Sequence, residues 1–189
     1  MSDSRHWDSI FASTDERKLG WHETDVSQTM KFVAPLTAGG PIRVFLPGAG
    51  TSLGVDELLD RGCSLILNDI SGEALARLKR RIGERGQLLW LQHDIADPLP
   101  GKLPAVDLWL DRAVLHFLTR ERDIAAYFRN LKSLLKPGGH VLLAEFSTRG
   151  AEKCAGLKLH RYSEGEFRER LGPSFDLIDS EEYSYTNPA

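Results

Sequence analysis

Apolar residues in this chain form short continuous runs that alternate with stretches of helical periodicity. The runs cover residues 42–46, 64–67, 88–91, 106–110 and 140–146, and each is followed by glycine, proline or polar residues. Continuous apolar runs of this length are typical of strands that are buried on both faces. We therefore expect five buried strands.

Between the runs, apolar residues recur every three or four positions, which predicts amphipathic helices. The clearest repeat consists of Ile124, Tyr127, Phe128, Leu131, Leu134 and Leu135, at i, i+3, i+4, i+7, i+10 and i+11. The Lys-Pro-Gly-Gly segment at 136–139 is expected to break this helix. An earlier repeat of Leu75, Leu78 and Ile82 is expected to end at Gly86.

Strands that alternate with helices imply an α/β fold, Rossmann-like and doubly wound, with a mostly parallel sheet flanked by helices on both faces. After residue 150 the order changes. Ser163 and Glu166 have the spacing of a capping box, which predicts a short helix. Phe175 and Leu177 alternate with polar residues, which predicts a strand with one exposed face.

Composition and charge narrow the function classes. The net charge is -3 and the sequence pI is about 6.1, which argues against a general nucleic-acid binder because phosphate contacts need a basic surface. Cys63 and Cys154 lie far apart without metal-ligand spacing, so we predict no metal site. No apolar run has the length of a membrane span or of a signal peptide, so a cytoplasmic protein without membrane contact is expected.

Candidate ligand-binding residues follow the predicted strands, because ligands of such sheets bind at the carboxyl ends of the strands. Gly48 and Gly50 follow the first strand, where glycine lets the backbone turn tightly and approach a ligand. Asp69 follows the second strand at the spacing of a ribose-binding carboxylate. An ordinary strand-to-helix turn, with Asp69 capping it beside Ser71, is the alternative.

Two ligand types fit this arrangement, a nicotinamide dinucleotide and S-adenosylmethionine. The dinucleotide fingerprint requires a third glycine where this chain has Leu53, and Gly54 comes one residue late. S-adenosylmethionine has no pyrophosphate and does not need that glycine. The pattern therefore favours S-adenosylmethionine, and a nicotinamide-dependent reductase is a weaker choice.

The third and fourth strands also end in polar residues. Asp94 can accept a hydrogen bond from an adenine amino group while Ile95 packs on the ring, or Asp94 can simply begin a turn. Asp111, Arg112 and His116 follow the fourth strand, where His116 can act as a base. The alternative is an Asp111–Arg112 ion pair with a satisfied, partly buried His116.

Four segments resemble the successive motifs of class I S-adenosylmethionine-dependent methyltransferases: residues 44–50, 67–71, 107–113 and 135–139. The 44–47 opening, Val-Phe-Leu-Pro, is similar to that of the thiopurine S-methyltransferase-like branch. Residues 7–11 and 19–22 are similar to small bacterial members. The resemblance extends from residue 5 to residue 180.

The resemblance implies roles for individual residues. It places Gly48, Ala49 and Gly50 along the methionine part of the cofactor, Asp69 on the ribose, and Asp94 and Ile95 at the adenine. Further cofactor-binding residues are Trp21, Pro47, Asn68 and Ile70. It places Asp111 and Arg112 beside the methyl group, so that Asp111 counts as both cofactor-binding and catalytic, and His116 is the third catalytic candidate. Trp21 belongs to the lid.

The chain is then expected to be one methyltransferase domain over residues 1–189. Residues 1–40 form an N-terminal helical lid, 41–150 the cofactor-binding core and 151–189 a C-terminal substrate-side segment. The aromatic residues at the N-terminus fit such a lid, although a plain packing helix explains them equally well.

Three departures from the family pattern stand out. Many members carry an acidic residue at the position of Leu46, and thiopurine-type members carry Leu-Cys-Gly where this chain has Gly-Ala-Gly at 48–50, so a thiopurine substrate is not implied. The chain stops at 185–189, where a final antiparallel strand would begin. We therefore expect an incomplete C-terminal antiparallel part and a monomer or weak homodimer.

The predicted function is methyl transfer from S-adenosylmethionine to a small-molecule nucleophile (a thiol, chalcogen or amine) by direct in-line displacement. A small-molecule acceptor is favoured over protein or nucleic acid because no extra domain or basic groove is visible. The alternative is a non-catalytic S-adenosylmethionine-binding or partner protein on the same fold, because fold alone does not prove activity.

Overall fold

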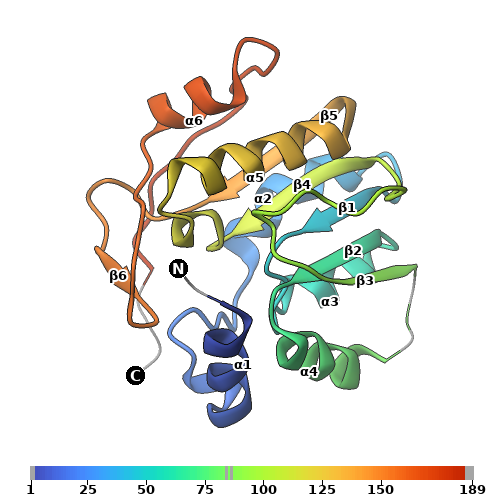
Figure 1. Ribbon diagram of the computed structural model, residues 1–189. Helices are drawn as coiled ribbons and strands as arrows, with labels where there is room; N and C mark the ends of the chain where they lie inside the picture. The colour runs from blue at the N-terminus through green and yellow to red at the C-terminus, as the bar shows by residue number, and fades with distance from the viewer. Residues whose placement is uncertain (1–2, 84, 86, 186–189) are drawn as a thin grey trace.

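A computed structural model describes residues 3–83, 85 and 87–185 (Figure 1). Its centre is a parallel sheet in the order β3-β2-β1-β4-β5. The strands are β1 (Arg43–Leu46), β2 (Ser64–Asp69), β3 (Leu88–Gln92), β4 (Val106–Arg112) and β5 (Leu135–Ala144). The chain builds the sheet outward from β1 to one edge and then returns to build the other half. This order confirms the doubly wound α/β fold.

Helices cover both faces of the sheet because successive strand residues point to opposite sides. On one face, Val44 and Leu67 pack with residues of α2 (Ser27–Thr37), α3 (Gly54–Asp60) and α4 (Gly72–Ile82). On the other face, Phe45 and Trp109 pack with the apolar stripe of α5 (Glu121–Leu134). The predicted helical repeats are therefore the core-facing stripes of α4 and α5.

Two predicted boundaries were wrong. β5 begins at Leu135, directly after α5, and pairs with Val106, so Leu135 belongs to the strand rather than to the helix. The pairing register shifts between Val106 and Leu108, which accommodates the 136–139 segment within the strand instead of ending the pairing. The strand also stops at Ala144, before residues 145–146.

The second boundary concerns α4, which ends at Ile82. Gly83 follows it with φ +66°, a conformation that favours glycine, and so takes the place expected for Gly86. Gly86 itself lies outside the described residues.

The C-terminal part confirms one prediction and corrects another. α6 (Glu164–Leu171) begins at Ser163, whose hydroxyl accepts a hydrogen bond from the Glu166 backbone N–H at 3.2 Å. β6 (Lys153–Cys154) and β7 (Leu157–Lys158) form a small antiparallel hairpin before it. The strand predicted around Phe175 and Leu177 was wrong, because residues 173–185 carry neither helix nor strand. Phe175 packs against the α5 side of the core, whereas Leu177 is exposed.

The remaining elements precede the sheet. They are α1 (Ser4–Ser13) and the short 3₁₀ helix η1 (Glu16–Lys18), and α1 lies against α4 (Figure 1). A further 3₁₀ turn, η2 (Leu115–Phe117), lies between β4 and α5. In the described part of the chain, no helix is both long and apolar enough to cross a membrane.

Leu108→Ala tests the packing of the sheet. Leu108 lies fully buried in the central strand β4, so its truncation should lower the free energy of unfolding by about 2–5 kcal/mol. Leu89 on the edge strand β3 is 45% exposed, and Leu89→Ala should cost less than about 1 kcal/mol. Urea unfolding of both variants measures the difference. Equal losses would contradict the described burial of β4.

Candidate active site

The loop after β1 turns tightly at the carboxyl edge of the sheet. Gly48 and Gly50 have φ values of +54° and +52°, which favour glycine. A Cβ atom on Gly48 would lie 2.2 Å from Val114 Cγ2, so this loop packs directly against the loop after β4. The Ala49 backbone N–H donates to the Asn68 carbonyl at 2.8 Å, which ties the loop to β2.

Asp69 joins this loop to the start of α4. One carboxylate oxygen accepts from the Gly50 backbone N–H and the other from the Ser71 backbone N–H, each at 2.8 Å. Asp69 is only 6% exposed, and burial raises its pKa to about 6. Each oxygen keeps a second lone pair, so the carboxylate can still accept bonds from a hydroxyl-bearing ligand.

The neighbouring predicted residues line the same edge. The Asn68 side-chain amide is buried and donates to the carbonyls of Leu91 and His93 at 3.0 and 2.9 Å, which fixes the end of β3. Ile70 is half-buried and lines the cleft at the sheet edge, as do Asn68 and Asp69.

The loop after β3 is held by α5. Asp94 accepts from the Ala96 backbone N–H at 2.9 Å, as expected of a residue that begins a turn. The Asn130 side chain donates to the carbonyls of Ile95 and Asp97 at 2.9 and 2.7 Å. Asp94 and Ile95 both line the cleft, Ile95 with a nearly buried side chain.

The N-terminal segment lies over the cleft. Asp8 of α1 accepts from the Ser71 hydroxyl at 2.6 Å, which fastens α1 to the start of α4. The Trp7 ring contacts the Trp21 ring edge-on at 5.6 Å and the Phe117 ring at 4.8 Å. This aromatic cluster therefore connects the N-terminal segment with the loop after β4.

Arg112 lines the cleft at the end of β4 and contacts the N-terminal segment. Its guanidinium pairs with Glu23 at 2.6 Å and donates to the Trp21 carbonyl at 3.3 Å. The Tyr185 ring lies 5.7 Å from the same guanidinium, and the Tyr185 hydroxyl donates to the His22 carbonyl at 2.6 Å. The ion-pair partner of Arg112 is thus Glu23, which the sequence did not indicate.

Asp111 points away from the cleft. It is fully buried, and its carboxyl group accepts from the Tyr127 hydroxyl at 2.6 Å and from the backbone N–H groups of Val114 and Leu115 at 3.1 and 3.2 Å. Burial, reinforced by the nearby charge of Glu145, raises the pKa of Asp111 well above its ordinary value. Asp111 does not line the cleft, in contrast to the other predicted site residues.

Glu145, directly after β5, lies beside Asp111 with a fully buried side chain. Its carboxylate accepts from the backbone N–H groups of Val114, Leu115 and His116 at 3.2–3.4 Å, and it lies 2.5 Å from His116 Nδ1. Burial raises the pKa of Glu145 to about 7.

His116 is also fully buried, and burial lowers its pKa to about 4, so the imidazole is neutral near pH 7. His116 Nε2 has no hydrogen-bond partner among the described residues. The predicted alternative, a histidine with hydrogen-bond partners at both ring nitrogens, therefore holds only for Nδ1.

Sequence reasoning missed Glu145, Tyr127 and Glu23. Glu145 was missed because the fifth strand was predicted to extend to residue 146. With the observed end at Ala144, Glu145 is the first residue after a strand, where ligand-binding residues are expected. Tyr127 fits an apolar helix stripe, and nothing in the pattern shows that its hydroxyl reaches Asp111. Among the described residues, no cluster of three or more histidine, cysteine, aspartate or glutamate side chains is arranged to hold a metal ion.

Comparisons with solved structures find similar folds. NodS N-methyltransferase from Bradyrhizobium japonicum, solved with S-adenosylhomocysteine, has 18% identity over 73% of this chain and 70% of that protein, with a TM-score of 0.61. The 1,6-didemethyltoxoflavin N1-methyltransferase from Burkholderia thailandensis has 21% identity over 89% and 70%, with a TM-score of 0.61. Magnesium protoporphyrin IX methyltransferase from Synechocystis has 16% identity over 90% and 84%, with a TM-score of 0.64.

The family assignment comes from the sequence itself. No curated protein matches the chain. A family model described as a methyltransferase domain matches residues 47–141, half of the 189 residues, including the loop after β1 and the ends of β2, β3 and β4. The chain therefore belongs to the methyltransferase-domain family and is a methyltransferase whose cofactor is S-adenosylmethionine.

Proposed function

We propose that this methyltransferase acts on a small molecule, at a thiol, chalcogen or amine, by direct in-line displacement. The observation that carries the proposal is the composition of the cleft on the Arg112 side. Its walls are the N-terminal segment, the loop after β4 and the C-terminal segment around Tyr185. The Burkholderia relative, solved with 1,6-didemethyltoxoflavin bound, is a fold neighbour with a small-molecule acceptor.

The residues at the strand ends fit the cofactor. The glycine conformations at Gly48 and Gly50 bring backbone close to a ligand without a side chain, which suits the methionine part, together with Pro47 and Ala49. Asp69 has free lone pairs for the ribose hydroxyls, beside Asn68 and Ile70. Asp94 and Ile95 line the same cleft, which supports their proposed role at the adenine.

When bound, S-adenosylmethionine supplies a methyl group that is already electrophilic, so the protein mainly has to position the reactants. The Trp21 ring contacts the rings of Trp7 and Phe11. In the proposed function, Trp21 covers the cleft as part of the lid and excludes water. Arg112 faces the acceptor side. Asp111 acts indirectly, because it is buried behind the cleft wall and shapes the loop that carries Val114.

The three parts of the chain then have separate tasks. Residues 1–40 act as the lid, 41–150 hold the cofactor and 151–189 shape the acceptor side. The 44–47 opening supports a relation to the thiopurine S-methyltransferase-like branch, without implying its substrate.

Asp69→Ala tests the cofactor assignment. Charge-assisted hydrogen bonds contribute about 1.5–3 kcal/mol, so loss of the carboxylate should weaken S-adenosylmethionine binding by more than about tenfold. Isothermal titration calorimetry measures the affinity, and circular dichroism checks that the variant is folded. Glu57→Ala, an exposed acid on α3 that does not line the cleft, is the control. A folded Asp69→Ala protein with unchanged affinity would remove the ribose assignment.

Tracking of a labelled methyl group tests the acceptor class. The enzyme is incubated with methyl-labelled S-adenosylmethionine and a dialysed cell extract, to which the small-molecule fraction is added back. We expect the label in small molecules that pass an ultrafiltration membrane, and only when that fraction is present. Label retained on protein or RNA would contradict a small-molecule acceptor.

A further inference from the structure

Three buried polar atoms on the acceptor side have no hydrogen-bond partner among the described residues. One is Arg112 Nε, in a guanidinium whose other nitrogens are paired. The other two are His116 Nε2 and the Tyr162 hydroxyl, in residues that are 0% and 2% exposed. Unpaired buried polar groups are costly and uncommon, and they call for an explanation such as a ligand or a catalytic role. Neither atom has a task in the cofactor site described above.

A chain of hydrogen bonds runs from the core to His116. Trp109 Nε1–H donates to the Tyr127 hydroxyl at 2.7 Å, and that hydroxyl donates to Asp111 at 2.6 Å. Asp111 and Glu145 are hydrogen-bonded to each other, and burial raises the pKa of both, so the pair keeps a proton. Both oxygens of Glu145 already accept hydrogen bonds from backbone N–H groups, which favours Glu145 as the ionised partner and Asp111 as the protonated one.

This arrangement determines which nitrogen of His116 carries its proton. The Glu145 oxygen next to His116 Nδ1 already accepts from the His116 backbone N–H at 3.2 Å, so it is an acceptor for Nδ1–H as well. The neutral imidazole therefore leaves Nε2 with a free lone pair. The chain of hydrogen bonds therefore ends at His116 Nε2, an unpaired atom that can take a proton, on the side of the cleft proposed for the methyl acceptor.

Tyr162 comes from the C-terminal segment and is linked to His116 through Phe146. Its backbone N–H donates to the Phe146 carbonyl at 2.8 Å, and the Phe146 ring contacts the His116 ring at 4.8 Å. Burial and the nearby Glu145 charge raise the pKa of Tyr162. Its hydroxyl is thus protonated at neutral pH and available as a hydrogen-bond donor.

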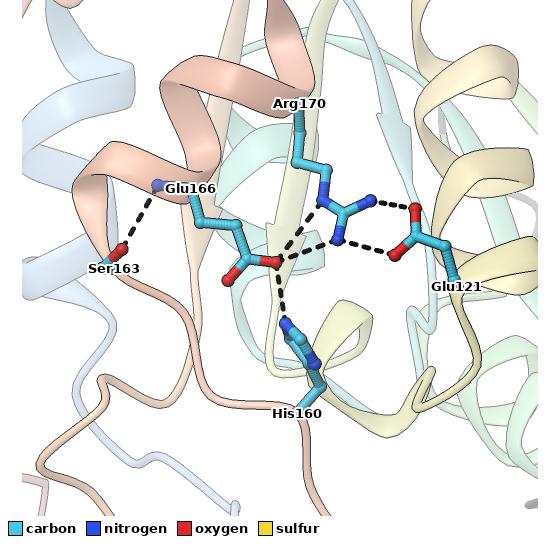
Figure 2. A network of polar contacts seen from close by, with 5 residues as sticks. All are labelled: Glu121, His160, Ser163, Glu166 and Arg170. Atoms are coloured by element: carbon cyan, nitrogen blue, oxygen red, sulfur yellow. Dashed lines mark hydrogen bonds and ion pairs between the residues drawn. The ribbon is translucent and has the colours of Figure 1, made fainter.

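A polar network holds this segment in position (Figure 2). The His160 backbone N–H donates to the His116 carbonyl at 2.8 Å, and the His160 ring lies 2.8 Å from Glu166 of α6. Arg170 pairs with Glu166 and with both oxygens of Glu121 at the start of α5. Because α5 and α6 are joined in this way, the wall that carries Tyr162 is fixed before a ligand arrives.

We propose that His116 Nε2 is the atom that takes the acceptor's proton, that Glu145 is its positioning residue, and that the Tyr162 hydroxyl binds the acceptor beside it. This inference rests on the proposed function and narrows its acceptor to a nucleophile that carries a proton on the attacking atom, for which an amine is the probe. The amine lone pair forms a bond to the methyl carbon while the carbon–sulfur bond breaks and its electrons stay on sulfur. The methylated nitrogen, now positively charged, releases its proton to His116 Nε2, and Glu145 at Nδ1 stabilises the imidazolium until the proton passes to solvent.

Imidazole ¹⁵N NMR tests the proton position without an acceptor. The probe is the full chain with S-adenosylhomocysteine at pH 7, and comparison with His116→Gln assigns the signal. We expect a protonated Nδ1 and an unprotonated Nε2, and Glu145→Gln should change this pattern. A proton on Nε2 would overturn the inference. Calorimetry on the same sample separates this inference from the proposed cofactor site. If the wild-type chain does not bind S-adenosylhomocysteine, the cofactor site is contradicted, whatever the proton position on His116.

Methyl transfer to two kinds of probe tests the role of His116. Aniline and benzylamine carry N–H protons, whereas iodide needs no base. His116→Gln should lower methylation of the amines by about 100-fold or more and leave iodide methylation within about threefold. His140→Gln, on β5, is the control. Unchanged amine methylation in His116→Gln would overturn the proposal, as would a wild-type enzyme that methylates iodide and neither amine.

The pH profile separates positioning from folding effects. The charged and titratable groups at His116 are Glu145, which contacts Nδ1, and Asp111 and Arg112, whose charges act on the imidazole. Glu145→Gln should shift the pH dependence of kcat/KM for the amines, because the imidazole loses the carboxylate that orients it. A Glu145→Gln enzyme with lower activity but the wild-type pH profile would show a merely structural role for Glu145.

Discussion

The active site depends on one buried pair of carboxyl groups, Asp111 and Glu145. They lie side by side beneath the loop after β4 and together accept the backbone N–H groups of three consecutive residues, 114–116. Ala113 enters this loop with φ +68°, a conformation that is strained for a residue with a Cβ atom. Two adjacent carboxylates in the interior would repel each other, so the pair is stable there only while it keeps a proton.

The cofactor loop depends on the same pair. Gly48 can approach so closely only because Val114 is held in place, and Val114 is held by Asp111 and Glu145. Asp69 has a similar role at the end of β2, where its buried carboxylate accepts the backbone N–H groups of both Gly50 and Ser71. Both halves of the cleft are therefore shaped by buried acids before a ligand binds. This suits a reaction in which the protein contributes mainly alignment.

Much of this could be predicted from the sequence, for physical reasons. Continuous apolar runs and helical repeats marked the strands and helices, and the strand-end rule selected Gly48, Gly50 and Asp69. The direction of a side chain at a strand end depends on packing, however, so the inward turn of Asp111 was not visible. The alternation of apolar and polar residues around Phe175 and Leu177 was misleading. A strand forms only beside another strand, and the alternation does not show whether such a neighbour is present.

The pH dependence of stability tests the shared proton most directly. The folded pKa values of Asp111 and Glu145 are raised, so their contribution is complete at low pH and is lost as pH rises through those values. His116, with its lowered pKa, acts in the opposite direction only below about pH 6.5. In urea unfolding of the apo enzyme above about pH 6.5, the free energy of unfolding should fall by up to about 1.4 kcal/mol per pH unit, and Asp111→Asn should flatten this slope. A wild-type free energy that stays constant or rises over this range would contradict a proton held between Asp111 and Glu145.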